Sequence, residues 1–162
     1  MTTKTPNILS IGIKRQRVGI AVFTNGRLEY VTGRALPTGS SREGRRELSA
    51  DIKKLIRRHD IGIVTMSQLT VQQRSSRSVV RLYKRVQSTV ILGGHALVVG
   101  NDNLATRKRG MEENLTEIYP ELRRYLGDAA WERRYYKHIF KAVSAGVAWL
   151  RINENERIPN DR

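Results

Sequence analysis

The dipeptide Asn25-Gly26, set between two apolar runs, is the feature that most limits what this chain can fold into. Asn-Gly between β-like segments is the strongest short signal for a β-hairpin, because both residues tolerate the positive φ angles of a type I′ turn. The flanking runs are residues 17–24 and 27–34, and an earlier run at 7–13 also has the length of a strand. We therefore expect three consecutive antiparallel strands at the start of the chain.

Helices and strands then alternate along the rest of the sequence. A serine, Ser40 or Ser41, can cap a helix that extends to about residue 59. Short apolar runs at 61–66 and 96–99 predict two buried strands.

Helical periodicity also extends over residues 78–92, from 111 to 126, and over 128–152, although Pro120 must kink the second of these stretches or start a new helix. The order β-β-β-α-β-α-β-α predicts an α/β fold with a five-stranded mixed sheet flanked by helices. With 162 residues the chain suits one core. We expect a single domain over residues 7–152, with flexible tails at 1–6 and 153–162.

The charge balance indicates a polyanionic partner. Thirty Lys and Arg face fifteen Asp and Glu, a formal net charge of +15. Nucleic acid is the leading candidate, ahead of an acidic protein, the ribosome or a membrane surface. The absence of cysteine excludes a disulfide framework and a thiolate metal site. No leader-like or membrane-spanning apolar run occurs, so we expect a soluble, cytoplasmic protein with no membrane partner.

The first hairpin carries a family resemblance. Its sequence from Leu9 to Phe23 reads LSIGIKRQRVGIAVF. It resembles the RuvC and YqgF branch of the RNase H-like superfamily, whose pattern is leucine, small residue, isoleucine, aspartate, any residue, glycine, polar or basic residues, and a glycine in the second strand. Gly12 stands at the aspartate position and Lys14 at that of the first glycine. The resemblance implies an RNase H-like fold of the Holliday junction resolvase type.

The other acidic positions of the family also look replaced. Ser67, at the end of the fourth predicted strand, is the equivalent of a resolvase glutamate. In the last helix His138 and Lys141 align with two aspartates three residues apart, and histidine occurs at the first of these in some resolvases. The resemblance thus implies four degenerate catalytic positions.

These replacements change the chemistry of the site. Resolvases of this type cleave phosphodiesters with divalent metals held by carboxylates, and Mg²⁺ prefers oxygen ligands. Glycine offers no ligand, serine is a poor one, and the ammonium group of Lys141 repels a cation. We expect no metal and no cofactor, with Mg²⁺ required only if catalysis persists, and a centre that now attracts phosphate directly.

Other carboxylates offer a weak alternative for catalysis. Asp102 follows the fifth predicted strand, and Asp51 and Asp60 are further candidates. Each has a plainer interpretation: Asp102 suits a turn or a helix cap, and Asp51 a solvated position on a helix.

Basic residues gather near the predicted carboxyl ends of strands, where ligands of such sheets bind. Any one of them can be a solvated surface charge, but together they predict contacts with phosphates. The predicted nucleic-acid-binding residues are Lys14, Arg15, Arg17, Arg74, Arg77, Arg81, Arg107, Lys108, Arg109, Lys137 and Lys141.

The last helix has two interpretations. Tyr135 and Tyr136 can stack on unpaired bases or can pack the helix on the sheet. His138 shares a helical stripe with Tyr135 and Ala142, so it can lie at the edge of the core instead of contacting a ligand.

The favoured hypothesis is a nucleic-acid-binding protein that recognises branched or structured DNA, in preference to RNA, without cleaving it. One alternative is an active metal-dependent endonuclease with a rearranged site. Another is an RNA- or ribosome-associated factor of the YqgF type. The resemblance also implies a homodimer.

Overall fold

The first three strands form the predicted meander. The computed structural model describes residues 4–36, 41–100, 110–127, 131 and 135–157, without side chains at 154–157. The strands are β1 (Asn7–Lys14), β2 (Arg17–Thr24) and β3 (Arg27–Ala35). At the second turn Asn25 has a φ of 51° and Gly26 a φ of 76°. These are the positive angles of a type I′ turn, so the predicted hairpin is confirmed.

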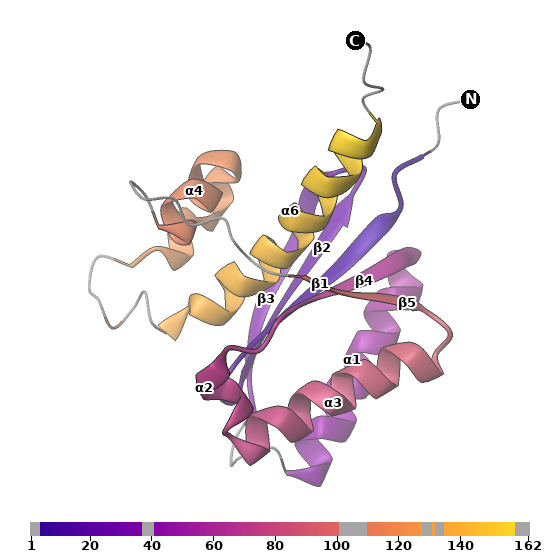
Figure 1. Cartoon of the computed structure of the whole chain (residues 1–162), viewed down its shortest axis with the longest axis vertical. Helices are drawn as coiled ribbons and strands as arrows, with labels where there is room; N and C mark the ends of the chain where they lie inside the picture. The colour runs from indigo at the N-terminus through magenta and orange to yellow at the C-terminus, as the bar shows by residue number, and fades with distance from the viewer. Residues whose placement is uncertain (1–3, 37–40, 101–109, 128–130, 132–134, 158–162) are drawn as a thin grey trace.

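Two further strands complete a mixed sheet in the order β3-β2-β1-β4-β5 (Figure 1). Strand β4 (Ile61–Ser67) pairs in parallel with β1, and β5 (Ala96–Gly100) pairs in parallel with β4. The predicted five-stranded mixed sheet is therefore confirmed, and β1 lies at its centre.

Helices α1 (Arg42–Arg58) and α3 (Arg77–Leu92) cover one face of the sheet. The Ser41 hydroxyl accepts a hydrogen bond from the Gly44 amide at 3.1 Å, which caps α1 as expected. The apolar stripes predicted for the two helices are buried against alternate residues of β1 and β2, including Leu48, Ile52, Val79, Leu82, Val86, Leu9, Ile11, Val18 and Ile20. Alternate residues of the strands and one face of each helix thus pack together in one core.

The other face is covered by α6 (Lys137–Arg157), α4 (Met111–Ile118) and the 3₁₀ helix η1 (Pro120–Tyr125). Pro120 begins a new helix, one of the two outcomes expected for it. None of the described helices combines the length and apolar character needed to cross a membrane.

The end of the last helix was predicted wrongly, and one short helix was not predicted. Helix α6 continues to Arg157, so residues 153–157 of the expected tail are helical; the first strong helix breaker after Ile152 is Pro159. The segment after β4, for which the sequence predicted neither a helix nor a strand, contains the short helix α2 (Val71–Arg74).

Three glycines line up across β1, β2 and β3 beneath α6, and we call them the glycine row. Gly12 pairs with Gly19, which pairs with Gly33. A Cβ atom on Gly19 would lie 2.1 Å from the carbonyl oxygen of His138, and one on Gly12 would lie 2.5 Å from the backbone nitrogen of Ala142. Because no side chain fits in this space, the row allows the backbone of α6 to lie directly on the sheet.

We expect Gly19→Ala to lower the free energy of unfolding by about 3 kcal/mol, the upper end of the usual cost of overpacking, because the added methyl meets backbone atoms that cannot rotate away. Gly100→Ala is the matched control, since a Cβ on Gly100 would have no neighbour within 4 Å. Urea denaturation of the two variants checks this. Equal midpoints would show that α6 moves freely on the strands.

Candidate nucleic-acid interface

The four positions that the family resemblance singled out lie at the carboxyl ends of β1 and β4 and in the first turns of α6. Ile11 pairs with Met66, so Gly12 and Ser67 follow one residue later on neighbouring strands. A Cβ on Gly12 would lie 2.8 Å from both the carbonyl oxygen of His138 and the carbonyl carbon of Lys141. Residues separated by more than a hundred positions thus share one small region, which we call the central site.

Gly12 leaves no room for an acidic side chain at the central site. The nearest atoms to a Cβ at this position all belong to the backbone of α6. Backbone atoms cannot be displaced by a rotamer change, so an aspartate here would push the helix away from the sheet. The space that a carboxylate would need is filled by the helix itself.

The residues of the central site do not fit a divalent metal. Within the described part of the chain, no three His, Asp or Glu side chains gather closely enough to hold a metal ion. Ser67 is a weak ligand and Lys141 brings a positive charge, whereas Mg²⁺ selects carboxylate oxygens. No step that depends on a metal follows from this arrangement.

The alternative carboxylates lie elsewhere. Asp51 of α1 forms an ion pair with Arg34 of β3, and Arg34 also contacts Glu47 at 3.0 Å. Asp60 occupies the turn before β4, at the opposite end of that strand from Ser67, with a φ of 49°. Asp102 lies outside the described residues. Neither Asp51 nor Asp60 can therefore replace the missing ligands.

His138 is a buried, neutral group at the centre of this arrangement. Its side chain is 3% exposed, and its Nε2 atom faces Gly33, where a Cβ would lie 2.5 Å away. Burial lowers the pKa of His138 to about 4, Arg17 and Lys14 add to the lowering, and the backbone of Tyr135 opposes it. The buried position expected for His138 as an edge of the core is thus observed. Two cations of the first hairpin lie close enough to disfavour its protonation.

Gln73 of α2 joins three elements beside the central site. Its Nε2 atom donates to the carbonyl of Ile13 at 2.8 Å, and its Oε1 atom accepts from the Thr70 amide at 2.9 Å. The amino group of Lys141 lies 3.5 Å from the same Oε1 atom. Gln73 was not predicted to have a role, although Thr70-x-x-Gln73 has the form of a capping box, and the structure forms that box.

Lys14, Arg15, Arg17 and Lys141 form what we call the basic cluster. Lys14 ends β1 and pairs with Arg17 at the start of β2, so only Arg15 and Gln16 form the loop between them. Lys14 and Arg17 share the sheet face of the glycine row because strand side chains alternate in direction. Arg15 is exposed, with a φ of 54°. The cluster therefore lies beside the central site.

Arg17 is held in position by Tyr135. Its guanidinium carbon lies 3.7 Å from the centre of the Tyr135 ring, and its Nη1 atom donates to the Tyr135 carbonyl at 3.4 Å. Tyr135, 40% exposed, packs edge-on against Tyr136. Of the two roles considered for these tyrosines, packing is observed, and one side of Tyr135 still reaches solvent.

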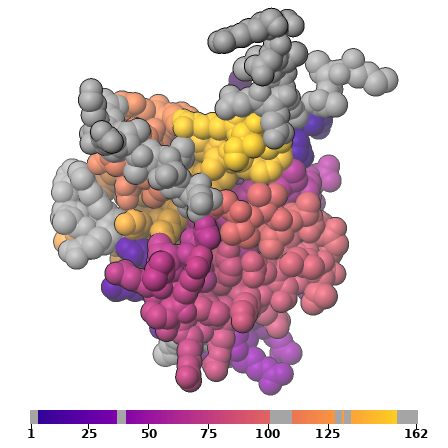
Figure 2. All heavy atoms as spheres, in the orientation of Figure 1, coloured from indigo at the N-terminus to yellow at the C-terminus, as the bar shows by residue number. Residues whose placement is uncertain are grey.

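The other predicted cations that the structure describes lie on α2, α3 and α6. Arg74 ends α2, and Arg77 and Arg81 are exposed on α3. Lys137 begins α6, while Arg107, Lys108 and Arg109 lie outside the described residues. In Figure 2, indigo atoms of the amino-terminal strands reach the surface beside the magenta of α2 and the gold of α6. The amino-terminal strands, α2 and α6 thus share part of one surface.

The sheet order, its parallel and antiparallel pairs, and a long carboxyl-terminal helix across β1 and β2 define an RNase H-like fold. More particularly, the chain has the fold of RuvC and other Holliday junction resolvases. It superposes on Thermus thermophilus RuvC in complex with a Holliday junction substrate with a TM-score of 0.67 and 11% identity, covering 88% of this chain and 91% of that one.

Two further resolvases have the same fold. The yeast mitochondrial Holliday junction resolvase matches with a TM-score of 0.60 and 10% identity, over 89% of this chain and 77% of that one. The Fowlpox virus resolvase, in complex with Holliday junction DNA, matches with a TM-score of 0.56 and 10% identity, over 90% and 97%. No protein-family profile and no curated protein sequence matches the chain.

The lowered pKa of His138 predicts a specific dependence of stability on pH. The residue binds a proton below about 4 when folded and below its ordinary 6.5 when unfolded. The unfolded chain therefore takes up the extra proton between these values. As the pH falls through this window the free energy of unfolding decreases, by roughly 3 kcal/mol for this residue.

His138→Gln removes the titrating group while keeping a polar side chain, so its unfolding free energy should vary less between pH 7 and pH 4 than that of the natural protein. Urea denaturation at several pH values gives the comparison. Parallel pH profiles for the two proteins would contradict the neutral, buried state of His138.

Proposed function

We propose that this protein binds branched or structured DNA through the basic cluster and does not cleave it. The observation that carries the proposal is the closed contact between Gly12 and the backbone of α6, with Lys14, Arg17 and Lys141 placed around it. A site that holds metals by carboxylates in a nuclease here presents positive charge and no space for an acid.

The loss of cleavage follows from the chemistry of phosphodiester hydrolysis. Metal ions in such nucleases activate the attacking water and stabilise the leaving oxygen, and both tasks need ligands that fix the metals. The described residues of the central site supply a hydroxyl, a neutral imidazole and an amine instead. A phosphate that approaches this site meets ammonium and guanidinium groups directly, which favours binding over hydrolysis.

The choice of DNA as partner is supported by two of the fold relatives, which are complexes with Holliday junction DNA. The net charge of +15 supports a partner with many phosphates. Recognition by backbone charge and by shape needs few base contacts, because phosphate contacts fix position without reading sequence. By the same resemblance we propose that the protein acts as a homodimer, which suits a junction with two-fold symmetry.

The triple variant Lys14→Gln, Arg15→Gln, Arg17→Gln should bind a four-way DNA junction more weakly than the natural protein. Each lost phosphate contact reduces the slope of log affinity against log salt by about one, so the slope should become less steep by about two to three. Fluorescence anisotropy with a labelled junction at several salt concentrations measures both quantities.

The matched control is Lys54→Gln, Arg57→Gln, Arg58→Gln, which removes one lysine and two arginines from the exposed side of α1, on the opposite face of the sheet. It removes the same formal charge as the cluster variant. It should retain most of the affinity of the natural protein, and its slope of log affinity against log salt should be steeper than that of the cluster variant. Equal losses of affinity and of salt slope in the two variants would show that the basic cluster contributes no more than any other positive charge on the surface. Competition by structured RNA in preference to the junction would favour the ribosome-associated alternative.

A further inference from the structure

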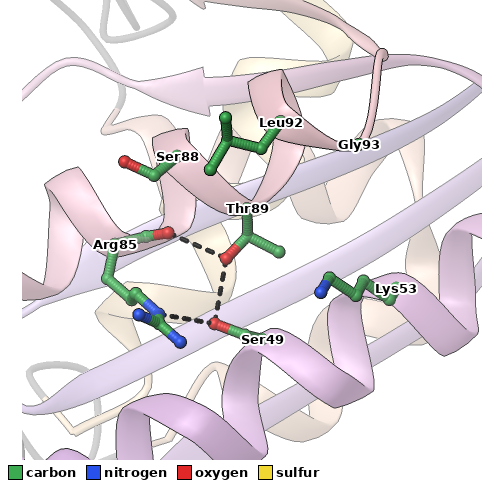
Figure 3. Close-up of a pocket in the computed structure, with 7 residues that line it drawn as sticks. All are labelled: Ser49, Lys53, Arg85, Ser88, Thr89, Leu92 and Gly93. Carbon is green, nitrogen blue, oxygen red and sulfur yellow. Dashed lines mark hydrogen bonds between the residues drawn. The ribbon is translucent and has the colours of Figure 1, made fainter.

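A small cavity between α1 and α3 lies on the face of the sheet opposite the glycine row. Its volume is about 210 Å³, and it is lined by Ser49 and Lys53 of α1, by Arg85, Ser88, Thr89 and Leu92 of α3, and by Gly93 (Figure 3). The residues from α1 are four positions apart, and those from α3 recur at helical spacing. The cavity therefore lies between the facing sides of two helices.

Two buried hydroxyls form the floor of this cavity. Ser49 is 6% exposed and Thr89 is 7% exposed. The Thr89 hydroxyl lies 2.9 Å from the Ser49 hydroxyl and 2.9 Å from the carbonyl of Arg85. Both hydroxyls have hydrogen-bond partners within the protein, so these two buried polar side chains are stable without a ligand.

Arg85 is fixed at the edge of the cavity by this floor. Its Nε atom donates to the Ser49 hydroxyl at 3.1 Å. A guanidinium has five N–H groups, and this contact uses the one on Nε, so the two terminal nitrogens keep their planar, paired geometry. That geometry matches two oxygens of a phosphate.

Lys53 supplies a second cation on the other side of the floor. In Figure 3 the guanidinium of Arg85 and the amino group of Lys53 lie on either side of the Ser49 hydroxyl. The lining contains two cations and three hydroxyls but no carboxylate. The neighbouring acids of α1, Glu47 and Asp51, are ion-paired with Arg34.

We propose that this cavity binds a phosphate group, with Arg85 and Lys53 as the cationic ligands and the Ser88 hydroxyl at the rim. Arginine, lysine and serine are among the side chains that contact phosphate oxygens in protein–nucleic acid complexes. The site is separate from the basic cluster, so it stands whether or not the cluster binds a junction. The phosphate can belong to a nucleic-acid backbone or to a small phosphorylated molecule.

The first arm of the test uses inorganic phosphate at constant ionic strength, with chloride as the ion it replaces. NMR signals of the Arg85 side-chain Nε–H and of the Ser49 and Thr89 amides should shift and saturate. Lys53→Gln, Arg85→Gln should abolish the saturation, whereas the control Lys54→Gln, Arg58→Gln, on the exposed side of α1, should keep it. Ser88→Asp, which adds a negative charge at the rim, should also abolish it.

Shifts that never saturate, or that are equal in the natural protein and in both cavity variants, would overturn the proposal. Circular dichroism of each variant confirms that the fold is kept; the Ser88→Asp variant tests the site without disturbing the contact between Arg85 and Ser49.

The second arm identifies the source of the phosphate with the labelled four-way junction. If the backbone of DNA is the ligand, Lys53→Gln, Arg85→Gln should reduce the salt slope by about one relative to the Lys54→Gln, Arg58→Gln control. An unchanged slope, together with saturable phosphate binding, assigns the site to a small phosphorylated molecule. Failure of the natural protein to bind the junction would overturn the proposed function and leave the phosphate site standing.

Discussion

The contact between the glycine row and the backbone of α6 is the constraint on which the rest of the structure depends. Strands β1, β2 and β3 each contribute one glycine at the same level. A Cβ on Gly12 or Gly19 would meet the backbone of α6, and one on Gly33 would meet the side chains of His138 and Ile139. The close approach brings His138 into the core and places Lys141 beside the carboxyl end of β1. It also occupies the position where a side chain of residue 12 would extend. The helix therefore determines both the packing of this face and the chemistry of the central site.

The same contact leaves cations, and no acidic side chain at residue 12, around the central site. With no carboxylate at residue 12, the cations Lys14, Arg17 and Lys141 need no metal between them and a phosphate. Each is also positioned by a neighbour: Lys14 and Arg17 by the strand ladder, Arg17 by the ring of Tyr135, and Lys141 by the amide of Gln73. Arg17 and Lys141, whose side chains are held by these contacts, lose less side-chain entropy on binding an anion than freely moving cations, which supports the proposed affinity for phosphates. A second phosphate site between α1 and α3 would place a contact on the opposite face of the sheet.

Much of the fold could be predicted because its signals are local. The Asn25-Gly26 turn, the apolar stripes of α1 and α3, and the short runs of β4 and β5 all depend on residues close in sequence. The order of these elements came from the same local patterns, and together with the first hairpin it carried the family resemblance.

The central site was harder to predict because it depends on register. Gly12, Gly19 and Gly33 are ordinary strand glycines until pairing places them in one row beneath a helix more than a hundred residues away. Helix α2 has only four residues, too few for a periodic signal, so the bridge made by Gln73 was missed. The cavity of Ser49 and Arg85 likewise depends on how α1 and α3 face each other. The apolar periodicity of one helix does not predict this arrangement.

The most direct test of the central claim is a denaturing gel of an end-labelled four-way DNA junction incubated with the protein in Mg²⁺ and, separately, in Mn²⁺, with a parallel native gel to measure binding. The structure predicts a junction that is retained on the native gel and uncut on the denaturing gel in either metal. Paired nicks that depend on the metal and disappear with EDTA would contradict it, because they would require carboxylate ligands that the described residues of the central site do not supply.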